Sequence, residues 1–393
     1  MATLTFHKLT PGAGLKVLLA LLAVLVALGL ASAYVMEHEG HVITGMNNQI
    51  VWGMPHVFAV FLIVAASGAL NLASVASVFN RADYKPFGRV SALLAITLLV
   101  GGLVVLVLDL GRPDRLTVAM TTYNFRSIFA WNIYLYTGFV VIVAAYLFVM
   151  MDRGVSRFAA VATAVGTLAF VWRLILTTGT GSIFGFLSAR EAYDSAILAP
   201  LFIAASLLYG LAVSILVLHV LARNQRQQFM GEDMLGRFRG LLILFSLAVL
   251  YFTAVFFLTK LYMSKHYGIV GFMLRDGGIY TAVFWLGQVG FGSLLPLVIL
   301  AASKTRAAIL SASALFIFGG LAQMYALIIG GQAYPLQLFP GMIETSSFFD
   351  GVVASYHPSI YEVGLGVGGL AFALLLAAIA ATLLPVLPKG ERI

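Results

Sequence analysis

The chain has 393 residues, of which 61% are hydrophobic and only 10% are charged. A soluble domain has about 25% charged and roughly 45–50% apolar residues, so this composition excludes a soluble or disordered protein and predicts an integral membrane protein. The absence of cysteine excludes disulfides, thiolate-bound iron–sulfur clusters and cysteine nucleophiles within this chain. The net charge of +8 resides in short loops between apolar segments, which membrane topology explains better than nucleic-acid binding.

Ten apolar segments are long enough to cross a bilayer, whose core of about 30 Å needs roughly 20 helical residues. They cover residues 15–36, 52–79, 88–110, 128–150, 157–178, 197–221, 239–262, 279–302, 306–329 and 363–387. Short polar connections separate most of them, so we expect one all-α polytopic membrane domain over residues 1–393. The two longest loops, 111–127 and 330–362, both follow odd-numbered segments and therefore lie on the same side of the membrane.

The distribution of basic residues predicts the orientation. Fifteen of the 23 Lys and Arg residues fall on the side of both termini and seven on the other side, with Arg173 inside a segment. The positive-inside rule then places both termini in the cytoplasm of a bacterium, with the long loops outside. The first segment, which ends near Ala31-Ser32-Ala33, also resembles a signal peptide. Its apolar run is longer than usual for one, which favours a retained helix.

Polar side chains follow one face of the second segment. They are Asn48, Trp52, His56, Ser67, Asn71, Ser74 and Ser77. At 3.6 residues per turn this face spans roughly 140°. Helix packing is the simplest explanation for the small residues from Ser67 to Ser77. His56, an ionisable group near the outer end of an apolar helix, is instead a functional candidate.

Further polar and ionisable residues are expected at the same outer level. They are Asp109, Arg126, Asn132, Arg173, Lys260, Asp276 and Glu362. Each alone is explained as an interfacial anchor, and Arg173 is long enough to snorkel outward. Together they predict one polar pocket at the outer face. The other intramembrane histidine, His219, lies near the opposite face and is best explained as interfacial. His56 and His219 therefore cannot ligate one haem, and too few ligands converge for a metal site.

A pocket with aromatic walls and a few oriented polar groups suits a flat hydrophobic ligand such as a quinone. Quinone chemistry moves two electrons and two protons, so it needs a titratable group and a hydrogen-bonding group near each carbonyl. The candidates for proton transfer are His56, Asp109 and Glu362, and those for orienting the ring are Asn48, Arg126 and Tyr134.

Four stretches of sequence carry a resemblance to a known family. They are Asn47 to Pro55, Asp109 to Arg115 with its continuation through Asn124-Phe125-Arg126-Ser127 to Ala130-Trp131, Gly330-Gly331-Gln332, and Tyr356 to Glu362. Over about 45–385 the chain resembles the NrfD/polysulfide reductase membrane-subunit family. Thr44 to Pro55 is most similar to the P subunit of the Dsr sulfur-metabolism membrane complex, with the large subunit of hydrogenase-2-type modules next.

The resemblance implies a haem-free, quinone-interacting subunit in which eight core helices form two four-helix bundles. It places a site for menaquinone or ubiquinone near the outer face, between the second, third, fourth and tenth helices. The positions that match the family motifs are Asn48, Trp52, His56, Asp109, Arg112, Arg126, Trp131 and Glu362. Gln323 is a departure, because many members carry Arg before the Gly-Gly-Gln element.

The implied partners are a ferredoxin-like iron–sulfur subunit on the periplasmic face, cytochrome c, cytochrome b and further iron–sulfur subunits, besides membrane lipid and no nucleic acid. Dissimilatory sulfur metabolism is the implied context. Two other functions stay open at this point. Ten helices with polar faces also suit an ion or solute transporter, and a membrane anchor without a ligand of its own would tolerate substitution of His56 and Glu362.

Overall fold

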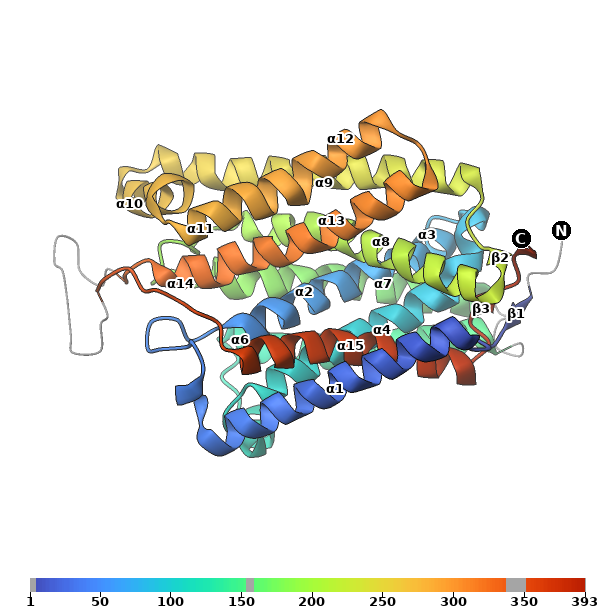
Figure 1. Cartoon of the computed structure of the whole chain (residues 1–393), viewed down its shortest axis with the longest axis horizontal. Helices are drawn as coiled ribbons and strands as arrows, with labels where there is room; N and C mark the ends of the chain where they lie inside the picture. The colour runs from blue at the N-terminus through green and yellow to red at the C-terminus, as the bar shows by residue number, and fades with distance from the viewer. Residues whose placement is uncertain (1–4, 153–158, 337–350, 393) are drawn as a thin grey trace.

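The computed structural model describes residues 5–152, 159–336 and 351–392 and confirms the all-α polytopic architecture (Figure 1). The described chain contains ten helical spans long and apolar enough to cross a membrane, with mean hydropathy between 1.7 and 2.8 over their most apolar stretches. In order, their elements are α1 (Ala13–Glu39), α2 (Met54–Ala69) with α3 (Asn71–Ser77), α4 (Gly88–Leu108), α6 (Ile128–Met151), α7 (Ala159–Gly185), α8 (Leu198–Gln225), α9 (Glu232–Tyr262), α11 (Ile279–Ala282) with α12 (Leu295–Ala302), α13 (Arg306–Tyr325) and α15 (Ile360–Leu383).

Three short helices, α5 (Leu116–Thr121), α10 (Tyr267–Gly271) and α14 (Gly331–Ala333), lie in or beside the connections. Of the predicted long loop 330–362, residues 337–350 lie outside the described residues, as do Arg153 and Arg157 of the charge count.

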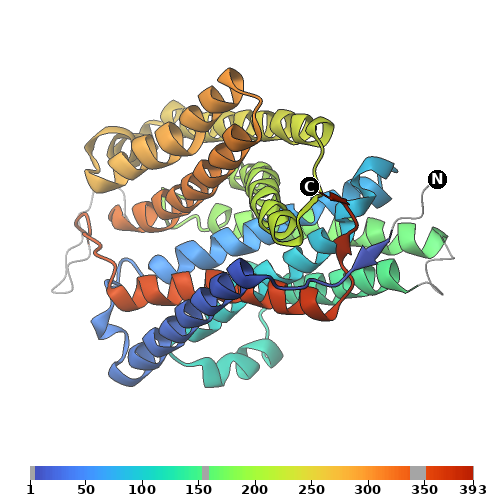
Figure 2. The same cartoon turned by 45° about the vertical axis from the view of Figure 1, so that its right-hand side comes forward.

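Both ends of the chain lie at the same end of the helical bundle, which we call the terminal end. There β1 (Phe6–His7) pairs antiparallel with β3 (Leu387–Pro388), and β2 (Gln227–Gln228) pairs with β4 (Glu391–Arg392). Figure 2, turned from the first view, shows β1 and β3 side by side at this end. The opposite end, where α1 finishes and α15 starts, is called the distal end (Figure 1).

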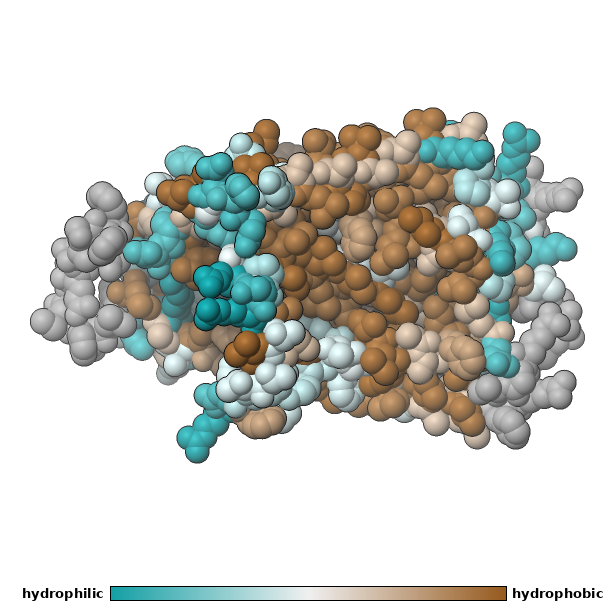
Figure 3. Space-filling model, turned by 90° about the horizontal axis from the view of Figure 1, so that it is seen from below, coloured by the Kyte–Doolittle hydropathy of each residue, from teal (hydrophilic) through white to brown (hydrophobic). Residues whose placement is uncertain are grey.

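The surface has the polarity of a membrane protein. Figure 3 shows an apolar band across the middle of the visible face, with hydrophilic residues gathered towards both ends. This distribution is expected when hydrocarbon contacts the middle of the bundle and water contacts its ends.

The helices form two bundles with two helices outside them. In the first bundle α2, α4, α6 and α7 pack in a ring, and in the second α8, α9, the α11–α12 span and α13 do the same. Helices α1 and α15 pack on each other, and α15 also packs against α4 and α2. The α2–α3 span is the centre of the molecule, with 94% of its most apolar stretch buried against 11% for α1.

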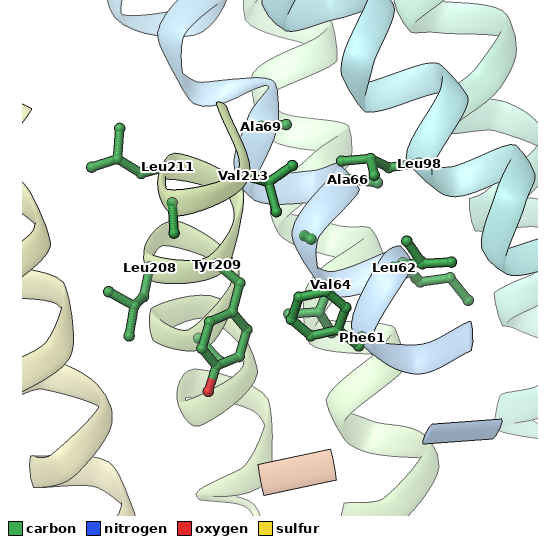
Figure 4. Close-up of a cluster of buried hydrophobic side chains, with 14 of the residues drawn as sticks. Phe61, Leu62, Val64, Ala66, Ala69, Leu98, Leu208, Tyr209, Leu211 and Val213 are labelled. Carbon is green, nitrogen blue, oxygen red and sulfur yellow. The ribbon is translucent and has the colours of Figure 1, made fainter. Parts of the chain in front are cut away.

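The two bundles meet where α2 crosses α8. Figure 4 shows Phe61 of α2 and Tyr209 of α8 among the buried side chains of this contact, with ring centroids 5.6 Å apart. Gly68 and Gly210 lie at the crossing, where a Cβ on either would collide with the backbone of the other helix. Two glycines therefore allow the closest approach of the bundles, as small residues commonly do in membrane helices.

The predicted single helix 52–79 begins at Met54 and is interrupted at Leu70, between α2 and α3. The cause is the side chain of Ser91 on α4. Its Oγ donates to the carbonyl of Ala69 at 2.6 Å and accepts from the backbone N–H of Ala73 at 3.1 Å. Those two groups would otherwise bond to each other in a continuous helix, so an inserted hydroxyl opens the ladder.

The fifth span also differs from its prediction over 157–178, because α7 continues to Gly185 at the distal end. Arg173 therefore lies in the middle of the span, and the residue is only 3% exposed. Its guanidinium lies over the ring of Phe170, 5.0 Å from the centroid. The expectation that Arg173 snorkels to the outer surface is wrong.

Candidate functional site

A cavity of about 450 Å³ opens within the first bundle towards the distal end. This volume lies within the range of small-molecule sites, about 300–1,000 Å³. Apolar residues make most of its wall: Val60, Ile63, Leu103, Leu106, Val107, Leu110, Leu116, Met120, Phe129, Ile133, Ile183, Phe184 and Ile328. The remaining lining residues are Trp52, His56, Asp109, Asn132, Tyr136 and Thr137. The site is thus mostly apolar with a few polar groups, as a flat hydrophobic ligand requires.

A histidine and an aspartate form the ionisable part of the wall. His56 lies in the first turn of α2, and Asp109 follows the last residue of α4. The Nδ1 atom of His56 is 2.9 Å from Oδ2 of Asp109, whose side chain is only 1% exposed. An imidazole held by a buried carboxylate can accept a proton at one ring nitrogen and release one at the other.

A second histidine contacts the same carboxylate. His41 lies in the short 3₁₀ turn between α1 and α2, and its Nε2 atom is 3.6 Å from Oδ1 of Asp109. The same nitrogen is 3.2 Å from the backbone carbonyl oxygen of Asp109. Sequence reasoning missed His41, although its position in the connection after the first span places it on the same side as Asp109.

Aromatic rings fix the position of the His56 imidazole. Trp52 is stacked on it, with ring centroids 6.1 Å apart and planes inclined by 27°. Phe184 meets the Trp52 ring edge-on at 5.8 Å, and Phe129 lies 6.0 Å from it. These three aromatic side chains all line the cavity, so a planar ligand beside His56 would have aromatic neighbours.

Asn132 contributes a polar group from α6. Its Nδ2 atom donates to the carbonyls of Ile128 at 2.9 Å and Gly179 at 3.1 Å. Its Oδ1 atom is buried without a hydrogen-bond partner among the described residues. Because buried acceptors are costly unless they are bonded, a ligand hydroxyl or a water in the cavity would satisfy this oxygen.

Three of the predicted site residues line this cavity, namely Trp52, His56 and Asp109. The other six do not: Asn48, Arg112, Arg126, Trp131, Tyr134 and Glu362. Asn48 and Arg126 are exposed, and Arg112 lies 3.7 Å from Asp114 on the surface.

Trp131 and Tyr134 lie on the exposed face of α6. The Nε1 atom of Trp131 donates to the carbonyl of Phe125 at 2.8 Å, and Tyr134 packs on Tyr123 with ring centroids 4.6 Å apart. The α6 residues that line the cavity are instead Phe129, Asn132, Ile133, Tyr136 and Thr137. Because successive residues of a helix are rotated by 100°, Trp131 and Tyr134 lie on a different side of α6 from the residues that line the cavity.

Glu362 binds the segment that leads into α2. Its carboxylate accepts hydrogen bonds from the backbone N–H of Gly45 at 2.7 Å and of Ser359 at 2.8 Å, and from the hydroxyl of Tyr356 at 2.5 Å. With Ser359 it forms the capping box that starts α15. The Tyr356 hydroxyl also accepts from Met54 N–H at 2.7 Å. Burial, and then the hydrogen bond to Glu362, raise the pKa of Tyr356, which keeps the phenol protonated.

The Gly-Gly-Gln element holds the same segment from the second bundle. The Oε1 atom of Gln332 accepts from the N–H groups of Val51 at 3.0 Å and Trp52 at 3.1 Å, and its Nε2 donates to the Trp52 carbonyl at 3.0 Å. Arg190 donates to the Gln49 carbonyl at 2.8 Å. The backbone beside Trp52 and His56 is therefore fixed by the second bundle and by the connection between α7 and α8.

The prediction that the outer polar groups form one pocket is wrong, because only some of them lie together. Asp109 and Asn132 share the cavity, but Lys260 is buried in the second bundle and donates to the Glu191 carbonyl at 2.5 Å. Asp276 pairs on the surface with the adjacent Arg275 at 2.7 Å. Gln323, which stands where the resembled family often has Arg, also lies in the second bundle, where it accepts a hydrogen bond from the Tyr209 hydroxyl. Across the described residues, no three His, Asp or Glu side chains are arranged to hold a metal ion.

Comparisons with known proteins agree on one family. The protein-family model described as polysulphide reductase, NrfD, matches residues 42–335, a range that includes every residue lining the cavity. The chain is 30% identical over 388 residues to the Hdr-like menaquinol oxidoreductase integral membrane subunit of Archaeoglobus fulgidus, covering 95% of this chain and 93% of that protein.

Two further relatives are named as parts of reductases. A selenate reductase subunit of Mesobacillus selenatarsenatis is 23% identical over 96% of both proteins. A polysulfide reductase chain of Wolinella succinogenes is 26% identical over 73% of this chain and 96% of its own length. The named relatives are thus components of multi-subunit oxidoreductases.

Proposed function

This chain belongs to the NrfD polysulphide reductase family, and we propose that it oxidises a quinol in the cavity of its first bundle. In this proposal the chain binds the quinol, takes its protons and delivers its electrons to an iron–sulfur partner. The observation that carries the proposal is the cavity, which combines apolar and aromatic walls with the His56–Asp109 pair at 2.9 Å. Menaquinol is the proposed substrate, since the Archaeoglobus relative is named a menaquinol oxidoreductase subunit.

The proposed roles follow from the positions of the groups. His56 accepts a proton from one quinol hydroxyl, and Asp109 stabilises the imidazolium that forms. Asn132 accepts a hydrogen bond from the other hydroxyl through its unpartnered Oδ1. Trp52, Phe129 and Phe184 flank the ring. The other predicted ring-binding residues (Asn48, Arg112, Arg126, Trp131 and Tyr134) then contribute outside the cavity.

The electrons must leave through another protein, because this chain has no cysteine to hold a cluster. We propose that a ferredoxin-like iron–sulfur subunit docks on the distal end, near which the cavity lies. The excess of Lys and Arg on the side of the termini supports a cytoplasmic terminal end and a periplasmic distal end. Further iron–sulfur and cytochrome subunits, and a sulfur compound as terminal substrate, complete the proposed complex.

Affinity purification in mild detergent tests this proposal directly. We expect an iron–sulfur protein to co-purify with the chain, together with iron and about one extractable menaquinone per complex. The isolated complex should oxidise menadiol, a soluble naphthoquinol, with a dye as electron acceptor. A stable, iron-free, solitary protein without quinone would contradict the proposal and favour a transporter.

We also propose that Glu362 positions the site and does not itself carry protons from the quinol. Glu362→Gln keeps the size of the side chain but weakens its three accepted hydrogen bonds, which should cost roughly 1–3 kcal/mol of stability. We expect a lower melting temperature of the purified complex and less than a tenfold loss of turnover below that temperature. Glu39→Gln, on the exposed end of α1, is the matched control. An unchanged melting temperature with abolished turnover would return Glu362 to proton transfer.

A further inference from the structure

The position of His41 beside the site is held by a defined backbone turn and by side-chain contacts. Gly40, with a φ of +81°, ends α1 and turns the chain so that His41 starts a short 3₁₀ turn. The Thr44 hydroxyl donates to the His41 carbonyl at 2.6 Å and closes that turn. On the other side of the ring is Gly111, with a φ of +66°, where a Cβ would be 3.3 Å from Cε1 of His41.

His41 reaches the Asp109 carboxylate from outside the cavity. It contacts Oδ1, whereas His56 contacts Oδ2, so each imidazole has its own carboxylate oxygen. His56 and Asp109 line the cavity and His41 does not. The His41 side chain is 30% exposed while that of Asp109 is 1% exposed. The Asp109 carboxylate therefore has almost no direct contact with water, and the partly exposed His41 ring links it to the surface of the distal end.

We propose that His41 is the outer member of a proton relay that runs from His56 through Asp109 to water. The inference rests on the proposed quinol oxidation and adds the route by which its protons leave. Oxidation of one quinol yields one quinone, two electrons and two protons, and the electrons pass to the iron–sulfur partner. The protons follow one after the other, so the relay must return to its starting state between them.

Each transfer uses a contact that the structure contains. A quinol hydroxyl gives its proton to Nε2 of His56, and the proton on Nδ1 passes to Oδ2 of Asp109 across 2.9 Å. The carboxyl group then rotates to turn this proton towards His41. The His41 ring changes to its Nδ1–H tautomer, gives up the hydrogen bond from Nε2 to the Asp109 carbonyl oxygen, and accepts the proton on Nε2 once the 3.6 Å separation has shortened. The partly exposed His41 ring finally releases a proton from Nδ1 to water, and tautomerisation of the His56 ring with the reverse rotation of the carboxyl group restores the relay.

The test uses the purified complex and three variants. His41→Ala removes the relay and leaves space for an added imidazole, while His41→Gln keeps a polar side chain that cannot shuttle a proton. His38→Ala is the matched control, because His38 is exposed on the last turn of α1 and stacks on Tyr34. Turnover is measured with menadiol and a dye acceptor, with and without added imidazole, and the melting temperature of each variant is recorded.

We expect both His41 variants to lose kcat about tenfold or more with little change in KM, because proton release becomes limiting. Added imidazole should restore His41→Ala in a concentration-dependent way and leave His41→Gln and His38→Ala unchanged. Wild-type turnover in His41→Ala would overturn the relay, as would a raised KM with unchanged kcat or a loss that imidazole does not restore. In those cases the proposed function would stand, whereas a wild-type complex without menadiol oxidation would refute the function itself.

Discussion

His56→Leu should lower quinol-driven turnover of the complex at least about a hundredfold. General acid–base groups typically contribute about 10²–10⁴ to a rate, and leucine fills similar space without a proton acceptor. His56 is also the lining residue whose Nδ1 meets Asp109, so its loss leaves the buried carboxylate without that partner. The measurement is steady-state menadiol oxidation by the purified complex, together with its subunit composition.

The complex with His56→Leu should still assemble, because His56 lines the cavity whereas the partner is proposed to bind the outer surface. His219→Leu is the matched control, since His219 is a half-buried histidine in α8 outside the cavity. We expect that variant to keep its turnover within about twofold. Wild-type turnover in His56→Leu, in an intact complex, would mean that this chain is an anchor without a quinone chemistry of its own.

The ten spans were predictable because each carries its own hydropathy signal. The interruption at Leu70 was not, because its cause is a hydroxyl of Ser91 on the next span. The end of α7 was misplaced for a related reason. Small and polar residues such as Thr180 and Ser182 lower the hydropathy there, yet they are buried inside the protein, where hydropathy no longer marks the membrane boundary.

His56 and Asp109 could be identified as candidate site residues from the sequence, because an ionisable side chain at the end of an apolar helix is rare and usually has a function. Trp131 and Tyr134 were predicted to bind the ligand, whereas Asn132 was expected only among the polar groups at the outer level, although all three lie within one turn of α6. That helix is apolar on all sides, so its sequence does not indicate which face meets the bundle. Packing against α7 and α4 decides the matter, and it turns Asn132 inward.

The roles of Glu362 and Gln332 depend on contacts between distant parts of the sequence. Glu362 holds Gly45, and Gln332 holds Val51 and Trp52, across more than 250 residues in each case. Their residue types alone suit proton transfer or ligand binding equally well. The sequence could therefore indicate that these motifs belong near the site, but the structure shows that they support the segment leading into α2.

Asp109→Asn should have an effect as large as that of His56→Leu, about a hundredfold or more in turnover. The substitution keeps the shape of the side chain and some hydrogen bonding, but it removes the negative charge between two imidazoles and the ability to relay a proton. Binding of a naphthoquinone-type inhibitor, measured by titration of the purified complex, should change much less than turnover. Asp114→Asn, on the exposed surface of the same loop, should leave both quantities unchanged.

The double variant His56→Leu/Asp109→Asn gives the sharpest result. If the two residues form one unit for proton removal, the second substitution adds little to the first, as happens when catalytic groups act together. We therefore expect the double variant to retain about the same residual turnover as either single variant. Losses that multiply to about 10⁴ would show that the residues act independently, and the 2.9 Å contact between them would then be structural. Wild-type turnover in Asp109→Asn would remove both the carboxylate and His41 from the proton route.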